Sequence, residues 1–126
     1  MSIQFLNVDL ELKSKSSLQA IVNSFGDDVD VLGCSPVGSH YQAAFESPGT
    51  PTGDPDSLIR YFCDLISNLA GTGKKAWETA YSRVFNIGFE SGSEPKHIES
   101  ELSPDTIAKI PSVGASIKIT IYESDA

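Results

Sequence analysis

Positively charged residues are scarce in this chain, and one long stretch has none at all. The 126 residues include 9 Lys and Arg against 17 Asp and Glu, which gives a formal net charge of −8. No Lys or Arg occurs between Ser16 and Ile59. Nucleic acids and anionic membranes bind positively charged surfaces, so this balance disfavours both as partners. It suits either plain solubility or a positively charged protein partner.

The sequence also lacks a long apolar run, an export signal and a cysteine framework. Its most apolar segment, residues 58–70, is interrupted by Arg60 and Asp64 and is too polar to span a bilayer. The first residues show no basic segment followed by an apolar one, so we expect a cytoplasmic protein. Cys34 and Cys63 have no His or Cys at a metal-binding spacing, and we expect both to be reduced thiols.

No catalytic or cofactor-binding motif is complete. The segment 71–75 (Gly-Thr-Gly-Lys-Lys) lacks the spacing and the Ser/Thr of a phosphate loop, and we interpret it as a helix end with solvated lysines. Residues 28–33 match three positions of a calcium loop but lack its later ligands, which favours an acidic turn. Neither His40 nor His97 lies beside a nucleophile signature, although a Cys34–His40 pair stays open. We expect no enzyme activity, no metal and no cofactor.

Hydrophobic periodicity predicts one α+β domain over residues 1–126. Alternating apolar residues predict strands at about 3–12, 29–31, 40–46, 83–90 and 116–123. Apolar residues at helical spacing predict helices at about 16–25, 54–70, 74–81 and 103–110. The resulting order, β-α-β-β-α-(α)-β-α-β, favours a single mixed or antiparallel sheet with helices packed on one face.

The last strand has the clearest pattern of all. Ile117, Ile119 and Ile121 alternate with polar residues, which predicts a dry isoleucine face and a wet face. Ile107 and Ile110 are expected to form the apolar side of the short helix before it. If the first and last strands are neighbours, Lys118 lies across from Asp9 or Glu11. The predicted wet face of the whole sheet carries Asn7, Asp9, Glu11, Asn86, Glu90, Lys118, Thr120 and Tyr122.

The end of the chain carries a family resemblance. The segment from Leu102-Ser103-Pro104 through Gly114 to Tyr122 resembles the closing signature of a family of small bacterial domains of unknown function. That resemblance implies a fold and no activity. In size, acidity and lack of catalytic motifs the chain is also similar to the immunity proteins of bacterial contact-dependent growth inhibition systems. Such proteins are encoded beside a toxin and neutralise it.

Charge and resemblance together predict a non-catalytic acidic binding protein, an immunity protein that covers the basic active site of a toxin such as a nuclease. The first candidate surface consists of acids from the stretch without Lys or Arg: Asp27, Asp28, Asp30, Asp54 and Asp56. The second candidate surface is the wet sheet face, with Asp9, Glu11, Glu90 and Tyr122. The alternative is a small ligand-binding domain or enzyme with a pocket between helices and sheet, in which His40 takes part.

Overall fold

The computed structural model describes residues 2–48, 53–94 and 97–124. Within these ranges the strands are β1 (Gln4–Ser14), β2 (Asp30–Val37), β3 (His40–Glu46), β4 (Ser82–Glu90) and β5 (Ser116–Tyr122). The helices are α1 (Gln19–Phe25), α2 (Pro55–Ser67), α3 (Gly71–Thr79) and α4 (Pro104–Ser112), with a 3-10 turn η1 (Gly26–Asp28) after α1. The α+β class and the predicted order of elements are confirmed.

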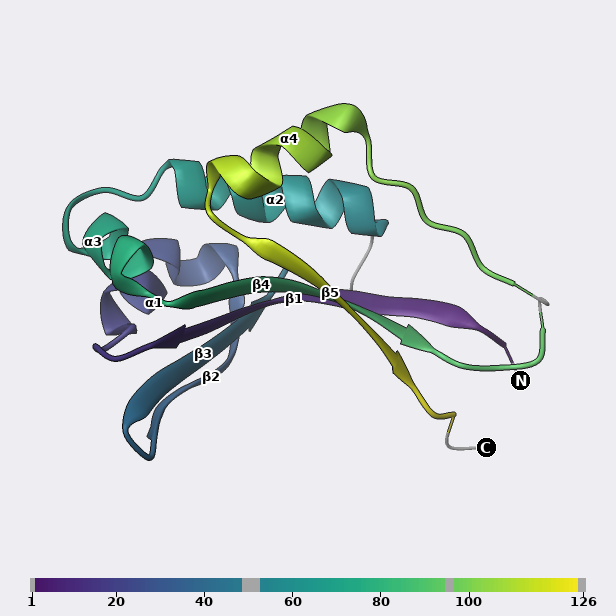
Figure 1. The fold of residues 1–126 in the computed structure, drawn as a ribbon, viewed down its shortest axis with the longest axis horizontal. Coiled ribbons are helices and arrows are strands. Elements are labelled where there is room, and N and C mark those ends of the chain that lie inside the picture. The colour runs from purple at the N-terminus through teal and green to yellow at the C-terminus, as the bar shows by residue number, and fades with distance from the viewer. Residues whose placement is uncertain (1, 49–52, 95–96, 125–126) are drawn as a thin grey trace.

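The strands form one mixed sheet in the spatial order β2-β3-β1-β4-β5. Neighbouring strands are antiparallel except β4 and β5, which are parallel because α4 lies in the connection between them. Figure 1 shows all the described helices on one side of the sheet. In the same view α4 lies over α2, so α2 separates α4 from the sheet. The sheet therefore has a helix-covered face and an open face.

The core lies between the helix-covered face and α1, α2 and α3. Val8, Leu10 and Leu12 of β1 are buried, whereas the residues between them face the open side. The predicted apolar stripe of α2 is confirmed, with Ile59 and Phe62 fully buried. Alternation along β1 thus assigns every second side chain either to the core or to the open face.

The glycines at 71 and 73 open a helix, so our interpretation of this segment as a helix end was wrong. Gly71 has a positive φ of 55° and is the first residue of α3. Gly73 lies in the first turn of the helix against Ser24 of α1, and a Cβ at position 73 would collide with the Ser24 hydroxyl. The missing side chain allows α1 and α3 to pack closely. Lys74 and Lys75 consequently lie within α3 and not beyond a helix end.

The predicted dry face of the last strand was also wrong. β5 lies at the edge of the sheet, and Ile117, Ile119 and Ile121 are 38%, 62% and 67% exposed. The isoleucines point to the helix-covered side, because they align with buried side chains of β4. However, α4 packs on α2 and leaves them uncovered. Of the two isoleucines predicted to form the apolar side of α4, Ile110 is buried, whereas Ile107 is 55% exposed and Thr106 is buried instead.

The first prediction compares two isoleucines that are Cα partners on adjacent strands. Ile87 of β4 is 5% exposed, whereas Ile119 of β5 is 62% exposed. We expect Ile87→Ala to lower the free energy of unfolding by about 2–5 kcal/mol, because it leaves a cavity in the core. Ile119→Ala should lower it by less than about 1 kcal/mol, as for other surface substitutions. Urea unfolding in dilute solution measures both, and equal losses would contradict the edge position of β5.

Candidate functional site

The open face of the sheet carries a row of polar side chains that crosses all the strands described above. The strand registers align Asp30 of β2, Glu46 of β3, Asp9 of β1, Asn86 of β4 and Lys118 of β5. Strand alternation places all of them on the face away from the helices. Three acids therefore lie side by side at the β2–β1 end of the row, and the only base in the row lies at the β5 end.

Glu11 of β1, one row away from Asp9, is neutralised by a base and held by an amide, both of which belong to the row. Lys118 Nζ lies 2.8 Å from Glu11 Oε1, and Asn86 Nδ2 donates a hydrogen bond of 3.0 Å to Glu11 Oε2. Thr120 Oγ1 donates in turn to Asn86 Oδ1 at 2.7 Å. The hydrogen bond to Glu11 raises the pKa of Lys118. β1 and β5 are not neighbours, so Lys118 reaches Glu11 across β4.

Asp9 and Glu46 have no such counter-charge. Among the described residues no Lys or Arg forms an ion pair with either carboxylate, and Asp9 Oδ1 is buried without a hydrogen-bond partner. Burial, reinforced by the negative charges of Glu46 and Glu11, raises the pKa of Asp9 from 3.8 to about 6. Glu46 accepts a hydrogen bond of 2.6 Å from Asn7 Nδ2. Two acids are therefore held together at the centre of the open face.

Glu46 is the residue of this site that neither candidate surface included. It follows Phe45, a core residue, so alternation in β3 assigns it to the open face. That signal was present in the sequence. The sequence did not show that Glu46 lies close to Asp9, because this closeness depends on the pairing of β3 with β1.

A shallow hollow of ≈ 390 Å³ lies beside the acidic row. Gly33 of β2 and Ala44 of β3, which are register partners, line it, and the missing side chain of Gly33 and the single methyl group of Ala44 leave space above the sheet. Leu32, Glu11 and Lys118 also contribute to its lining. Its lining has two bases, Lys13 and Lys118, and one acid, Glu11, which Lys118 already neutralises, so the candidate contacts for a positively charged partner are the carboxylates beside the hollow and not the hollow itself.

The acids of the first candidate surface lie on three different elements. Asp30 lies in the row on the open face, so it joins the second candidate surface. Asp27 and Asp28 lie in η1, at the end of α1. Asp54 and Asp56 lie at the start of α2, in the helix layer. The proposed sites thus separate into an open-face group, a turn group and a helix-start group.

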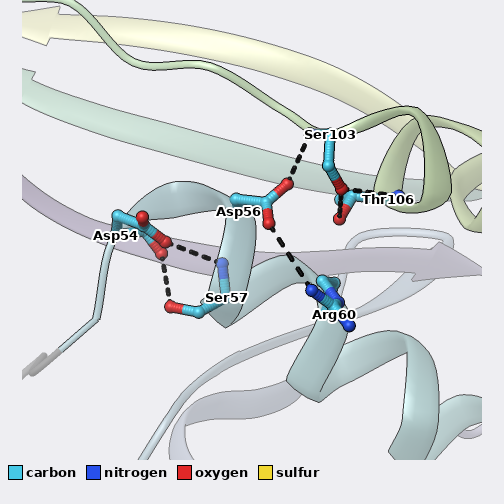
Figure 2. A network of polar contacts seen from close by, with 6 residues as sticks. All are labelled: Asp54, Asp56, Ser57, Arg60, Ser103 and Thr106. Carbon is cyan, nitrogen blue, oxygen red and sulfur yellow. Dashed lines mark hydrogen bonds and ion pairs between the residues drawn. The ribbon is translucent and has the colours of Figure 1, made fainter.

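The two acids at the start of α2 hold helices in place, as Figure 2 shows. Asp54 is the N-cap of α2, and its Oδ1 accepts a hydrogen bond of 2.8 Å from the Ser57 N–H. Asp56 Oδ1 accepts a hydrogen bond of 2.7 Å from the N–H of Ser103, which is itself the N-cap of α4. This bond is the main cause that lowers the pKa of Asp56. Both carboxylates already have structural partners, which makes them weaker candidates for binding.

Glu90 and Tyr122 lie together at the far end of the open face. They are Cα partners on β4 and β5, and Gln4 Nε2 donates a hydrogen bond of 3.2 Å to Glu90. Tyr122 is partly exposed and is an aromatic side chain at the rim of this face. The open face therefore combines Asp9, Glu11 and Glu90 from three rows of one surface.

A Cys34–His40 pair is ruled out by strand alternation. Cys34 is the register partner of the buried Ala43, so it faces the helix side, whereas His40 lies on the open side of β3. His40 Nε2 lies 3.1 Å from the Gln42 side chain. Cys63 is buried, and the loss of hydration raises the pKa of its thiol to about 11. Both cysteines are free thiols, as expected.

Comparison with known proteins finds no match for this chain, whether among family models, curated proteins or solved structures. The described residues hold no group of three or more His, Cys, Asp or Glu side chains arranged for a metal ion. None of the helices in the described part of the chain is both long enough and apolar enough to cross a membrane. The resemblance of residues 102–122 to a bacterial domain family stays a prediction.

The second prediction concerns Asp9 and pH. Its pKa of about 6 in the folded protein exceeds the ordinary value of 3.8, so between about pH 4 and 6 the folded state binds a proton that the unfolded state has lost. The contribution of Asp9 to stability is therefore highest at low pH and is lost as pH rises through 6. We expect Asp9→Asn to raise the free energy of unfolding at pH 7.5 by roughly 1–3 kcal/mol and to flatten its fall between pH 4 and 6.

Denaturant unfolding across this pH range measures the effect. Asp64→Asn is the matched control, because it removes one negative charge from an exposed position of α2. We expect the control to keep the pH dependence of the wild-type protein. Identical pH profiles for Asp9→Asn and wild type would show that Asp9 is not desolvated as described.

Proposed function

We propose that this protein is a non-catalytic acidic binding protein that uses the open face of its sheet to capture a positively charged protein. The partner is a toxin domain, and binding covers its active site. The protein would thus be an immunity protein that acts in the cytoplasm. The chain's net charge of −8 favours such an encounter, because opposite charges steer the two molecules together.

One observation carries the proposal. Asp9 and Glu46 are held together on the open face, no Lys or Arg of the described segments forms an ion pair with either, and Asp9 Oδ1 is buried without a hydrogen-bond partner there. An arrangement that raises the pKa of a carboxyl group by about two units destabilises the isolated protein at neutral pH. Such an arrangement is characteristic of functional sites. A Lys or Arg side chain from a partner would supply the missing charge and donor.

A nuclease is the class of toxin that this surface fits best. Its active site binds phosphate groups and is therefore rich in positive charge. A row of carboxylates at strand spacing, such as Asp30, Glu46 and Asp9, can occupy the positions of those phosphates. Covering the site in this way requires no chemistry from the inhibitor.

The alternative of a ligand pocket between helices and sheet is less favoured. A hollow of ≈ 430 Å³ does lie between α2, α3 and the C-terminal end of α4, and Trp77 and Arg83 line it. However, the Arg83 guanidinium donates hydrogen bonds to the backbone oxygens of Trp77, Ala80 and Gly114. This arginine joins α3, β4 and the end of α4. His40 does not line this hollow.

The third prediction separates the candidate surfaces with two matched triple variants. The open-face variant carries Asp9→Asn, Asp30→Asn and Glu46→Gln. The control variant carries Asp27→Asn, Asp28→Asn and Asp54→Asn, and the asparagine introduced by the last change can still cap α2. Each variant removes three negative charges from the same starting charge of −8, so the change in the overall field is equal.

The measurement is binding to the purified protein encoded directly beside this one, followed by surface plasmon resonance at several salt concentrations. We expect the open-face variant to weaken binding by at least about tenfold, because it removes charge pairs at the interface. The control variant should reduce only the association rate, and only at low salt. Greater loss in the control variant would move the site to η1 and α2. Unchanged binding in both would contradict capture by charge.

A further inference from the structure

β5 forms an edge of the sheet, and no strand among the described residues pairs with its outer side. It is the last strand in the spatial order, and its register with β4 runs without a shift from Ser116 to Tyr122. It contains no proline, and Lys118 is its only charged residue. Natural sheets usually protect such an edge, because its free N–H and C=O groups can pair with a strand of another molecule.

The opposite edge of the same sheet shows that protection. β2 contains Pro36, which has no N–H to donate, and its register with β3 shifts between Val31 and Gly33. β2 also begins with an acid, Asp30. These features make β2 a poor template for a further strand, whereas β5 has none of them.

The backbone N–H and C=O groups of the three isoleucines of β5 point toward the free edge of the sheet. The Ser91 N–H donates a hydrogen bond of 2.8 Å to the Tyr122 carbonyl oxygen, so the backbone groups of Tyr122 point to the β4 side. Backbone groups along a strand alternate between its two sides. The N–H and C=O groups of Ile117, Ile119 and Ile121 consequently point outward.

We propose that the β5 edge pairs with the β5 edge of a second copy of this chain, antiparallel and with Ile119 on the two-fold axis. In this register Ile119 lies opposite Ile119 of the second copy, and Ile117 lies opposite Ile121. All of these residues have outward-pointing backbone groups, so each pair exchanges two N–H···O=C hydrogen bonds. The sequence of β5 is symmetric in polarity about Ile119, as an interface of a two-fold dimer requires.

The side chains favour the same register. The isoleucines of both copies lie on one face and cover one another, which buries apolar surface that is now 38–67% exposed. On the other face, Lys118 lies opposite Thr120 of the second copy and not opposite another lysine. One strand pair with three isoleucines per copy is at the small end of specific interfaces, so we expect a dissociation constant in the micromolar range.

The local charge at the β5 edge favours a second copy of this chain over a basic protein as the binding partner. Residues 103–122 contain one acid, Asp105, and two bases, Lys109 and Lys118, although the whole chain has a net charge of −8. Two acidic molecules repel each other least where they meet through this segment. The same segment has no excess of acid to attract a positively charged protein. A two-fold axis normal to the sheet also places the open faces of both copies on the same side.

Association of the purified protein tests the proposal without any other partner, so it does not depend on the proposed function. Sedimentation velocity over a range of concentrations should show a reversible monomer–dimer equilibrium. Ile119→Lys should weaken the dimer by at least about a hundredfold, because two ammonium groups then meet at the axis. Ile107→Lys is the matched control, since Ile107 is similarly exposed but lies on α4, and it should leave the equilibrium unchanged.

Cysteine cross-linking tests the register. In a Cys34→Ser background, Ile119→Cys should form a covalent dimer on oxidation, because hydrogen-bonded antiparallel partners have Cα atoms about 5.5 Å apart. Ile121→Cys should not, since residue 121 and its symmetry copy are about 13 Å apart along the strands. A chain that stays monomeric at every concentration would overturn the proposal. So would equal loss of the dimer in both lysine variants, or cross-linking through residue 121 alone.

Discussion

Burial of one face of β1 is the interaction on which the rest of the structure depends. β1 lies at the centre of the sheet, and Val8, Leu10 and Leu12 are buried between the sheet and the helix layer that contains α2. Because side chains alternate along a strand, burying these three commits Asp9 and Glu11 to the open face. A shift of β1 by one residue would exchange the two sets and place carboxylates in the core. The core and the acidic face are therefore set by the same register.

The two acids on β1 have opposite electrostatic environments. Glu11 has Lys118 and Asn86 as partners, whereas Asp9 faces Glu46 and has a buried oxygen without a partner. The sheet thus balances one carboxylate with its own lysine, whereas no Lys or Arg among the described residues forms an ion pair with the other. Where local rules are broken at a cost in stability, a functional site is the usual reason. The contrast between the paired Glu11 and the unpaired Asp9, in adjacent rows of the sheet, distinguishes the acids of the open face from those in η1 and α2.

Local signals predicted most of the fold. Alternation and helical spacing identified the elements, and Asp54 and Ser103 cap the helices that they were expected to begin. Expectations were wrong where a residue's environment depends on distant segments. The isoleucines of β5 have the pattern of a core face, yet none of the helices that the structure describes covers them. The pattern identifies a strand with one apolar face, but it does not say what covers that face.

The sequence by itself determined which side chains share a face, because the two-residue period of a strand and the helical period are properties of the local backbone. It also determined the net negative charge, which depends only on composition, and the helix caps, which join residues three positions apart. Only the tertiary structure decided that Glu46 lies beside Asp9, that Lys118 reaches Glu11 across β4, and that Asp30 leaves the other acids to join the open face. Strand order joins residues far apart in the chain, and it depends on how the whole core packs.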